Sequence, residues 1–324
     1  MKIAILDDYQ DACRTLQAWR HLDGHEVTVF RDTVKDEDRL VERLKPFEAV
    51  VLIRERTRFT ASLLERLPAL KALSQTGKAG PHIDVAACTR LGVAVLEGSG
   101  SPYATAELTW GLVLVAMRRI PQEVENLKRG GWQQTVGTGL RGRTLGIYGY
   151  GKIGSVVAGY GKAFGMNVLV WGRQGSLERA AAAGLACAAS REALFESADV
   201  LTVHVRLAPE TRGMVTAQDL GRMKPGAVFV NTSRAELVVP GALAAALTAG
   251  RPGFAAVDVY EEEPILGAAH PLLALGNAIC TPHLGYVEKD GYELYFGGAF
   301  ENLAAFAGGA PRNVANPEYA SARR

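Results

Sequence analysis

Short apolar runs alternate with amphipathic stretches along the first hundred residues, and this alternation predicts strands and helices in turn. Strands are expected at Lys2–Leu6, Glu26–Phe30, Ala49–Ile53, Leu70–Ser74 and Val93–Leu96. A helical period between them predicts helices at Asp11–His21, Asp36–Leu44, Ala61–Leu67 and Ile83–Leu91. Strands that alternate with helices are typical of a parallel sheet covered on both faces.

A second alternation of the same kind follows a long, mostly apolar helical pattern at Ala104–Met117. Its strands are expected at Thr144–Tyr148, Asn167–Trp171, Val200–His204, Ala227–Asn231 and Phe254–Val257, with a helix after the first strand that ends near Phe164. Another long helical pattern, Lys289–Phe306, precedes a tail that contains Pro311. The pattern therefore predicts the α/β class, with two doubly wound parallel sheets.

The length and the composition fit this organisation. A chain of 324 residues is too long for one compact core, and 48% hydrophobic with 22% charged residues is an ordinary globular balance. The formal net charge is +2, from 36 basic and 34 acidic residues. Such near-neutrality favours neither a nucleic acid nor an anionic membrane as partner.

The four cysteines, Cys13, Cys88, Cys187 and Cys280, form no C-x-x-C pair. This spacing predicts neither a zinc site nor a redox dithiol, so we expect no metal and a reducing cytoplasm. The apolar run that begins at Lys2 is short and ends at acidic residues, which favours a first strand over a signal peptide. No apolar run is long enough for a membrane helix.

The strand expected at Thr144–Tyr148 leads into Gly149-Tyr150-Gly151-Lys152-Ile153-Gly154, which has the spacing G-x-G-x-x-G. In dinucleotide sites the first glycine allows a tight turn, the second lets the backbone approach the pyrophosphate, and the third allows close helix–strand packing. The following helix would direct its N-terminus at the phosphates. A glycine-rich turn in an ordinary α/β protein is the alternative, and the flanking strand and helix favour the dinucleotide.

The residues after the next strand bear on which dinucleotide is bound. Gly172 and Arg173 stand where an NAD-selective site usually has an acidic residue for the ribose 2′-hydroxyl. Without that carboxylate a 2′-phosphate is not repelled, and a guanidinium can bind it with two hydrogen bonds. The sequence therefore favours NADP(H), with NAD(H) as the alternative cofactor. The competing interpretation of Arg173 is a solvated surface arginine.

Five further segments, taken together and in this order, resemble the D-isomer-specific 2-hydroxyacid dehydrogenase family. The resemblance covers nearly the whole chain and is more specific than the glycine loop alone. The segments are Leu140-Arg141-Gly142-Arg143-Thr144-Leu145-Gly146-Ile147, Glu210-Thr211-Arg212-Gly213, Met223–Arg234, Asp258-Val259-Tyr260-Glu261-Glu262-Glu263-Pro264 and Thr281-Pro282-His283-Leu284-Gly285.

The resemblance implies two Rossmann-like or flavodoxin-like domains with the active site in the cleft between them. Residues 1–100 and 285–324 would form a discontinuous substrate domain, and residues 101–284 would form the inserted dinucleotide-binding domain. The two long helical patterns would then be the interdomain crossings. A homodimer is expected, because members of this family pair through the nucleotide domain and its long helix.

The resemblance assigns catalysis to Arg234, Glu263 and His283, and the chemistry is reasonable for these residue types. Imidazole titrates near neutral pH, so His283 suits an acid that protonates a developing alkoxide. Glu263 would favour the imidazolium form and orient it. Arg234 can hold the substrate carboxylate and polarise its carbonyl group. Each residue alone has an ordinary structural explanation, and their common order favours the catalytic one.

The same resemblance predicts further binding residues. Substrate contacts are expected from Arg54, Lys78 and Ala79, with a surface salt bridge as the alternative for Arg54. Asp258 resembles the residue that holds the nicotinamide amide, its alternative being a plain carboxylate at a strand end. Arg206 is either a second phosphate contact or an exposed loop cation. The expected cofactor contacts are Thr105, the six residues of the glycine loop, Arg173, Val205, Arg206, Thr211, Thr232, Ser233, Asp258 and His283.

The resulting hypothesis is an NAD(P)-dependent reductase of small 2-oxo acids, with glyoxylate or hydroxypyruvate as substrates by resemblance. A non-catalytic NAD(H)-sensing protein of corepressor type is the alternative from another class. A formate dehydrogenase is less favoured because Glu263 pairs with His283 where that subgroup has glutamine. No regulatory domain of the longer phosphoglycerate dehydrogenases fits in 324 residues.

Overall fold

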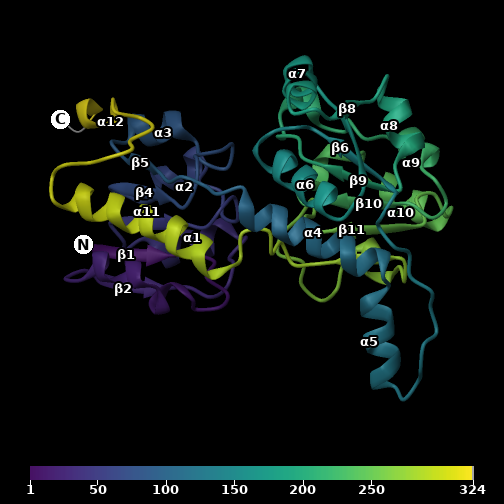
Figure 1. Ribbon diagram of the computed structural model, residues 1–324. Helices are drawn as coiled ribbons and strands as arrows, with labels where there is room; N and C mark the ends of the chain where they lie inside the picture. Colours follow the sequence, from purple (N-terminus) through teal and green to yellow (C-terminus); the bar gives the residue numbers. More distant parts are fainter. Residues whose placement is uncertain (323–324) are drawn as a thin grey trace. The chain divides into compact units, whose positions relative to one another are not determined.

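The computed structural model describes residues 1–322 and divides the chain into two compact units (Figure 1). Unit 1 contains Met1–Ser101 and the segment that begins at Glu288, and unit 2 contains Pro102–Val287. Each unit holds one sheet in which every pair of neighbouring strands is parallel. The expected α/β class with two parallel sheets is therefore confirmed.

The sheet of unit 1 has five strands in the order β2-β1-β3-β4-β5. This order changes direction between β1 and β3, and ligands of such sheets bind beyond the carboxyl ends of the strands at that point. The strands are β1 (Lys2–Ile5), β2 (Glu26–Val29), β3 (Ala49–Leu52), β4 (Ala72–Gln75) and β5 (Ala94–Glu97). The helices are α1 (Glu37–Leu44), α2 (Ala61–Glu65), α3 (Val85–Arg90), α11 (Lys289–Ala307) and α12 (Tyr319–Ala322).

Local chemistry explains why these segments form where they do. Strands β3 and β4 are buried on both faces, which is why β3 is continuously apolar and β4 does not alternate between apolar and charged residues. Helix α1 begins after Asp36, whose carboxylate accepts a hydrogen bond from the Arg39 amide. The long helix α11 packs on β3, β4 and β5, so the C-terminal part of the chain completes unit 1.

The region expected as one helix at Asp11–His21 forms two 3-10 turns instead, η1 (Cys13–Thr15) and η2 (Gln17–Leu22). Asp11 has a left-handed backbone with φ 53°, and Leu16 is extended between the two turns. The buried Asp8 carboxylate accepts hydrogen bonds from the amides of Ala12 and Cys13. These side-chain bonds replace the backbone bonds that a continuous α-helix would make.

The sheet of unit 2 has seven strands in the order β12-β11-β10-β9-β6-β7-β8. Its strands are β6 (Thr144–Tyr148), β7 (Asn167–Trp171), β8 (Ala186–Cys187), β9 (Val200–Val203), β10 (Val228–Asn231), β11 (Phe254–Val257) and β12 (Ala278–Cys280). Its helices are α4 (Tyr103–Met117), α5 (Ile120–Lys128), α6 (Lys152–Ala163), α7 (Gln174–Ala182), α8 (Arg191–Ser197), α9 (Ala217–Arg222) and α10 (Ala242–Thr248). Short 3-10 turns are η3 (Pro209–Thr211), η4 (Ala235–Leu237) and η5 (Pro271–Ala274).

The expected strands and long helices of unit 2 are present, with end shifts of one or two residues at most. The hydrophobic pattern did not predict β8, β12, α5 or α7 to α10, because these elements are short or only partly buried. Helix α4 packs on α6 and on strands β10 and β11, which explains its mainly apolar sequence.

The tail after α11 docks on unit 1 by specific bonds. Val314 forms an antiparallel bridge with Leu96, at the edge strand β5. Asn316 is 2% exposed, and its side-chain oxygen accepts a hydrogen bond from the Val95 amide at 2.8 Å. Its side-chain nitrogen donates to the Val93 carbonyl at 2.9 Å and to the Thr89 hydroxyl at 3.0 Å. One buried amide therefore satisfies polar groups of β5 and α3.

Replacing Asn316 with alanine should lower the free energy of unfolding of unit 1 by about 2–4 kcal/mol, because the buried groups it serves lose their partners. Urea unfolding followed by circular dichroism measures the change. The control is Glu318→Ala, which removes an exposed side chain two residues further on. Equal stability of the Asn316 variant and the wild type would show that the tail is not anchored by this amide.

Candidate functional site

The glycine loop connects β6 to α6 in unit 2, and each of its glycines has a different surrounding. Gly149 has φ 99°, and an added Cβ would lie 2.5 Å from the His204 carbonyl oxygen. An added Cβ on Gly154 would lie 2.3 Å from the Gly149 carbonyl oxygen, so α6 packs directly on the loop. An added Cβ on Gly151 would have no atom within 4 Å of it. The loop thus has close packing at Gly149 and Gly154 and open space at Gly151, as a bound pyrophosphate requires.

The helix N-terminus adds an electrostatic argument for the same ligand. Gly151 is the N-cap of α6 and offers no side chain to bond the first amides of the helix. Those amides and the helix dipole favour an anion at this end. The residues present therefore fit the diphosphate of a nicotinamide dinucleotide, with Tyr150, Lys152 and Ile153 contributing backbone.

The end of β7 lies next to this loop. An added Cβ on Gly172 would lie 3.1 Å from Ser176 Cβ and 3.6 Å from Gly149 Cα, so little space exists for a side chain there. Arg173 is the N-cap residue of α7, and its Nη2 lies 3.0 Å from Glu210 Oε1. Arg179 of α7 donates to the Tyr150 carbonyl at 3.0 Å and so braces the glycine loop.

Several hydroxyl residues expected to contact the cofactor bond to the fold itself. Thr105 donates to the Gly285 carbonyl at 2.7 Å. Thr232 and Thr109 share a hydrogen bond of 2.7 Å, and Ser233 donates to the Val203 carbonyl at the same distance. Thr211 donates to the Arg206 carbonyl at 2.8 Å, which closes the loop after β9 that contains Val205. These side chains hold the loops at the carboxyl edge of the sheet, and their contact with a cofactor stays a prediction.

The structure brings Glu263 and His283 together. His283 Nδ1 lies 2.6 Å from Glu263 Oε2, and both side chains are mostly buried, with exposed fractions of 14% and 16%. Glu263 follows β11 and His283 follows β12, which are neighbouring strands. Because one imidazole nitrogen is bonded to the carboxylate, Nε2 is the atom that can exchange a proton with a ligand.

The loop that carries His283 depends on Asp258, whose side chain is fully buried. One carboxylate oxygen accepts bonds from the Thr281 hydroxyl at 2.6 Å and the Leu284 amide at 2.7 Å, and the other accepts from the Gly285 amide at 2.8 Å. Burial raises the pKa of Asp258, and the bond from Thr281 opposes that rise. His283 has a left-handed backbone with φ 52°. The bonds of Asp258 to residues on both sides of His283 hold this unfavourable conformation in place.

Tyr260 bonds to Glu263 and to the loop of His283, and the sequence pattern did not predict this role. Its backbone amide donates to Glu263 Oε1 at 2.9 Å. Its hydroxyl donates to the Thr281 carbonyl at 2.9 Å, and the same carbonyl accepts the His283 amide at 2.9 Å. The only sequence signal was its place in the segment Asp258–Pro264, since a tyrosine at a strand end is not by itself distinctive.

Arg234 follows β10, the strand next to β11, and lies half-buried at the start of η4. Its Nη1 donates to the Ser233 carbonyl at 2.7 Å, and its own carbonyl accepts from the Asn231 side chain at 2.9 Å. The three residues expected to act in catalysis therefore follow three adjacent parallel strands, at the same edge of the sheet of unit 2.

The substrate residues expected in unit 1 follow β3 and β4, again at a carboxyl edge. Arg54 has φ 55°, and its backbone is bonded on both sides, by the Thr76 hydroxyl and the Gln75 side chain. An added Cβ on Gly77 would lie 3.2 Å from Arg54 Nη1, so the absent side chain allows the guanidinium to approach the loop. The guanidinium also lies 5.8 Å from the centre of the Tyr295 ring.

Glu97, at the end of β5, determines how the loop after β4 presents its polar groups. Its carboxylate accepts the Ala79 amide at 2.9 Å and pairs with Lys78 Nζ at 2.8 Å. Among residues 1–322, no protein group accepts a hydrogen bond from the amides of Gly77 and Lys78. These two neighbouring amides are available to an anion, whereas the Ala79 amide is already bonded. Substrate contact of Lys78 and Ala79 stays a prediction.

His204, after β9, also lies beside the glycine loop and was not among the expected site residues. Its Nε2 lies 2.7 Å from the Thr202 hydroxyl, and burial lowers the pKa of His204 to about 4. The imidazole is therefore neutral at physiological pH. Its backbone carbonyl packs against Gly149, so this residue shapes the loop through its main chain.

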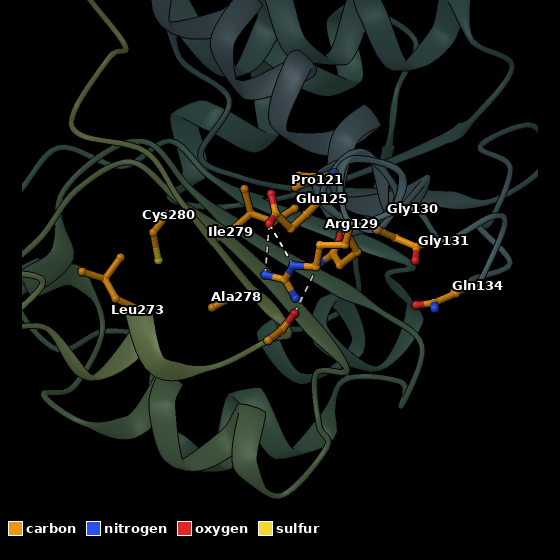
Figure 2. Close-up of a pocket in the computed structure, with 13 residues that line it drawn as sticks. Pro121, Glu125, Arg129, Gly130, Gly131, Gln134, Leu273, Ala278, Ile279 and Cys280 are labelled. Atoms are coloured by element: carbon orange, nitrogen blue, oxygen red, sulfur yellow. Dashed lines mark hydrogen bonds and ion pairs between the residues drawn. The ribbon is translucent and has the colours of Figure 1, made fainter.

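Unit 2 contains a cavity of about 950 Å³ (Figure 2). One wall is α5 and the glycines that follow it, and the opposite wall includes Ala278, Ile279 and Cys280 of β12. Figure 2 also shows the ion pair of Glu125 with Arg129, which lies on the α5 side at 3.0 Å. None of the residues expected to act in catalysis lines this cavity.

Residues 1–322 contain neither a metal-binding cluster nor a membrane-spanning helix. No group of three or more histidine, cysteine or acidic side chains is arranged to hold a metal ion. Within the same residues, no helix has both the length and the apolar character needed to cross a bilayer.

Comparison with known proteins agrees with the chemistry of the site. A family model described as "D-isomer specific 2-hydroxyacid dehydrogenase, NAD binding domain" matches residues 110–285. A glyoxylate reductase from Aeropyrum pernix is 38% identical over 278 residues, which is 82% of this chain and 82% of that protein. The family model matches unit 2 only, whereas the match with the glyoxylate reductase covers parts of both units.

Two further relatives carry a phosphoglycerate name. A D-3-phosphoglycerate dehydrogenase from Methanocaldococcus jannaschii is 37% identical over 289 residues, 88% of this chain and 53% of that protein. The chain thus spans about half the length of this relative. A crystal structure of a phosphoglycerate oxidoreductase from Vibrio cholerae is 57% identical with a TM-score of 0.93, covering 96% of this chain and 100% of that one.

Substitutions of two loop glycines should have different effects. Gly154→Ala should lower the stability of unit 2 by about 1–3 kcal/mol, because its methyl group would contact the Gly149 carbonyl. Gly151→Ala should leave the melting temperature unchanged and weaken dinucleotide binding roughly tenfold or more, since its methyl group enters the open space. Calorimetry of melting and of binding measures both. Unchanged binding by the Gly151 variant would exclude this loop as the pyrophosphate site.

Proposed function

Because the chain belongs to the D-isomer-specific 2-hydroxyacid dehydrogenase family, oxidoreductases that act on CH–OH groups, we propose that it reduces small 2-oxo acids to 2-hydroxy acids. The observation that carries the proposal is the hydrogen-bonded Glu263–His283 pair, whose loop is held by the buried Asp258. A paired imidazole at the carboxyl edge of a sheet that also carries a dinucleotide loop supports an acid–base role in this reaction.

When bound, the nicotinamide supplies the hydride. His283 Nε2 gives its proton to the carbonyl oxygen as negative charge develops there, and in the reverse direction it accepts that proton. The Glu263 carboxylate, which bonds His283 Nδ1, orients the imidazole ring and stabilises the charged imidazolium. Arg234 binds the carboxylate of the 2-oxo acid and polarises its carbonyl group.

The loop after β4 in unit 1 is proposed to bind a substrate carboxylate. The amides of Gly77 and Lys78 are available for a carboxylate, and the Arg54 guanidinium approaches the same loop. Two backbone amides and a guanidinium are a favourable donor set for a planar carboxylate. Ala79 then supports the loop through its bond to Glu97 rather than by binding substrate directly.

Glyoxylate and hydroxypyruvate are the first candidate substrates, and one relative is named a glyoxylate reductase. A second candidate is a phosphorylated three-carbon 2-oxo acid, as the names of other relatives indicate. The observation that favours it is the segment after β3, in which Arg54, Arg56 and Arg58 occupy alternate positions and Glu55 offsets one of their charges, so the segment has a net positive charge that attracts a second anionic group.

NADP(H) is proposed as the preferred cofactor. Gly172, which follows β7, carries no carboxylate. Arg173 is paired with Glu210, but its side chain is 72% exposed, so its guanidinium can also reach a 2′-phosphate. The four cysteines are free thiols, which supports a reducing cytoplasmic location.

We also propose that the protein is a homodimer paired through α5. Ile120, Val124 and Leu127 lie on one face of this helix and are 43–59% exposed. The loop after α5 adds Trp132, 74% exposed, and Val136, 95% exposed. In Figure 1, α5 and this loop extend from the body of unit 2, and the cavity of Figure 2 lies beside them. Several exposed apolar side chains on one helix and the loop after it are typical of a protein interface.

The reaction is tested with a panel of glyoxylate, hydroxypyruvate and its 3-phosphate, each with NADPH and with NADH. At least one acid should support cofactor oxidation, and His283→Ala should lower kcat by about two orders of magnitude or more while cofactor binding persists. His21→Ala is the control, because His21 pairs with Glu301 in unit 1.

If no acid supports oxidation although the cofactor binds, the NAD(H)-sensing alternative holds and the proposed reaction is wrong. If turnover occurs but His283→Ala is as active as the wild type, another group supplies the proton.

The dimer is tested by light scattering after size-exclusion chromatography. The wild type should have a mass near twice the 34.6 kDa of the chain, and a variant with Leu127→Ser and Trp132→Ser should be a monomer. Leu91→Ser, which changes an exposed leucine of unit 1, should remain a dimer. A wild-type protein that is monomeric at micromolar concentration would contradict the proposal.

A further inference from the structure

An acidic side chain does reach the end of β7, but from another part of the chain. Glu210 Oε1 lies 3.0 Å from Arg173 Nη2, although the two residues are separated by 37 positions. Their exposed fractions are 61% and 72%, so a solute can reach both groups. A carboxylate and a guanidinium are therefore adjacent at the strand end where a dinucleotide site distinguishes a ribose hydroxyl from a phosphate.

The fold explains why Glu210 comes to this place. Strands β9 and β7 both neighbour β6, so the loops that follow them lie at the same carboxyl edge. Glu210 is the middle residue of the short turn η3, and this turn is closed by the Thr211 hydroxyl, which donates to the carbonyls of Arg206 and Ala208. A backbone hydrogen bond and the bond from Arg173 lower the pKa of Glu210, so its carboxylate is charged at neutral pH.

The end of β7 leaves little room for a carboxylate of its own. An added Cβ on Gly172 would lie 3.1 Å from Ser176 Cβ, which is tighter than ordinary side-chain contact. A side chain at position 172 would require Ser176 to shift, and the carboxylate that lies at this strand end comes from a neighbouring loop instead. Glu210 is the acidic residue that bonds Arg173 in the part of the chain that the structure describes.

We propose that Glu210 determines the cofactor preference together with Arg173, by accepting the ribose hydroxyls of NAD(H) and by opposing the 2′-phosphate of NADP(H). The inference rests on the proposed function, since it needs a dinucleotide on the glycine loop. A carboxylate accepts hydrogen bonds from vicinal hydroxyls but repels a phosphate, whereas the guanidinium attracts the phosphate. The 2′-phosphate of NADP(H) competes with Glu210 for the Arg173 guanidinium, whereas NAD(H) has no such phosphate and leaves the Arg173–Glu210 ion pair intact.

The expected effect is moderate because both groups are solvated. Water and salt reduce the interaction of exposed charges, and an exposed ion pair is weak in itself. Removing one negative charge beside a phosphate of nearly two charges should change affinity by about fivefold. The ratio of the two dissociation constants is a sensitive measure, since changes common to both cofactors cancel.

The experiment measures the Kd of NADPH and of NADH by isothermal titration calorimetry, with the wild type, Glu210→Gln, Arg173→Gln and Glu196→Gln. Glu210→Gln should lower the ratio of Kd(NADPH) to Kd(NADH) about fivefold, and Arg173→Gln should raise it. Glu196→Gln should leave the ratio unchanged, because it removes an equally exposed carboxylate whose partner, Arg222, lies elsewhere in unit 2. Melting temperatures check that each variant is folded.

A ratio for Glu210→Gln that stays within twofold of the wild type overturns the inference. A raised ratio also overturns it, because Glu210 would then orient Arg173 toward the phosphate. In either case tight binding of one cofactor by the wild type leaves the proposed function intact. If the wild type binds neither dinucleotide, the proposed function and this inference both fail.

Discussion

The buried carboxylate of Asp258 is the interaction on which the site of unit 2 depends. It is fully buried, and it uses both oxygens to bind the Thr281 hydroxyl and the amides of Leu284 and Gly285. These groups lie on both sides of His283, whose left-handed backbone is unfavourable for a residue with a side chain. Burial disfavours the charge of Asp258 and raises its pKa, whereas the hydrogen bonds recover part of that cost. A costly buried group therefore holds a strained loop in one conformation.

The parallel sheets explain how residues far apart in sequence come to one edge. All the strands of a parallel sheet end on the same side, so the loops after β6, β7, β9, β10, β11 and β12 are neighbours. The glycine loop, Arg173, Glu210, Arg234, Glu263 and His283 all belong to these loops. Unit 1 repeats the arrangement with the loops after β3 and β4, which carry Arg54 and the amides of Gly77 and Lys78.

Polar side chains at both edges mostly bond to the protein, and this bonding is part of the site. The hydroxyl groups of Thr105, Thr211, Thr232 and Ser233 each bond another group of unit 2, in a loop, in helix α4 or in strand β9. Tyr260 joins the partners of the Glu263–His283 pair through its amide and its hydroxyl. Such second contacts preorganise the groups that act on a ligand, because they restrict rotamers before the ligand arrives.

The sequence by itself determined the α/β class, nearly all the long elements and the glycine loop, because hydrophobic periodicity and the need for small residues at tight turns are local properties. It also indicated Arg234, Glu263 and His283, through segments whose order resembles a known family. It did not predict the two 3-10 turns between Cys13 and Leu22, since the Asp8 side chain competes there with helical bonds. Only the tertiary structure decided that Asp258 holds the histidine loop, that Glu97 occupies the Ala79 amide and that Glu210 supplies a carboxylate to Arg173. These contacts join different loops, and their distances depend on strand order and sheet register, which no local pattern of residues records.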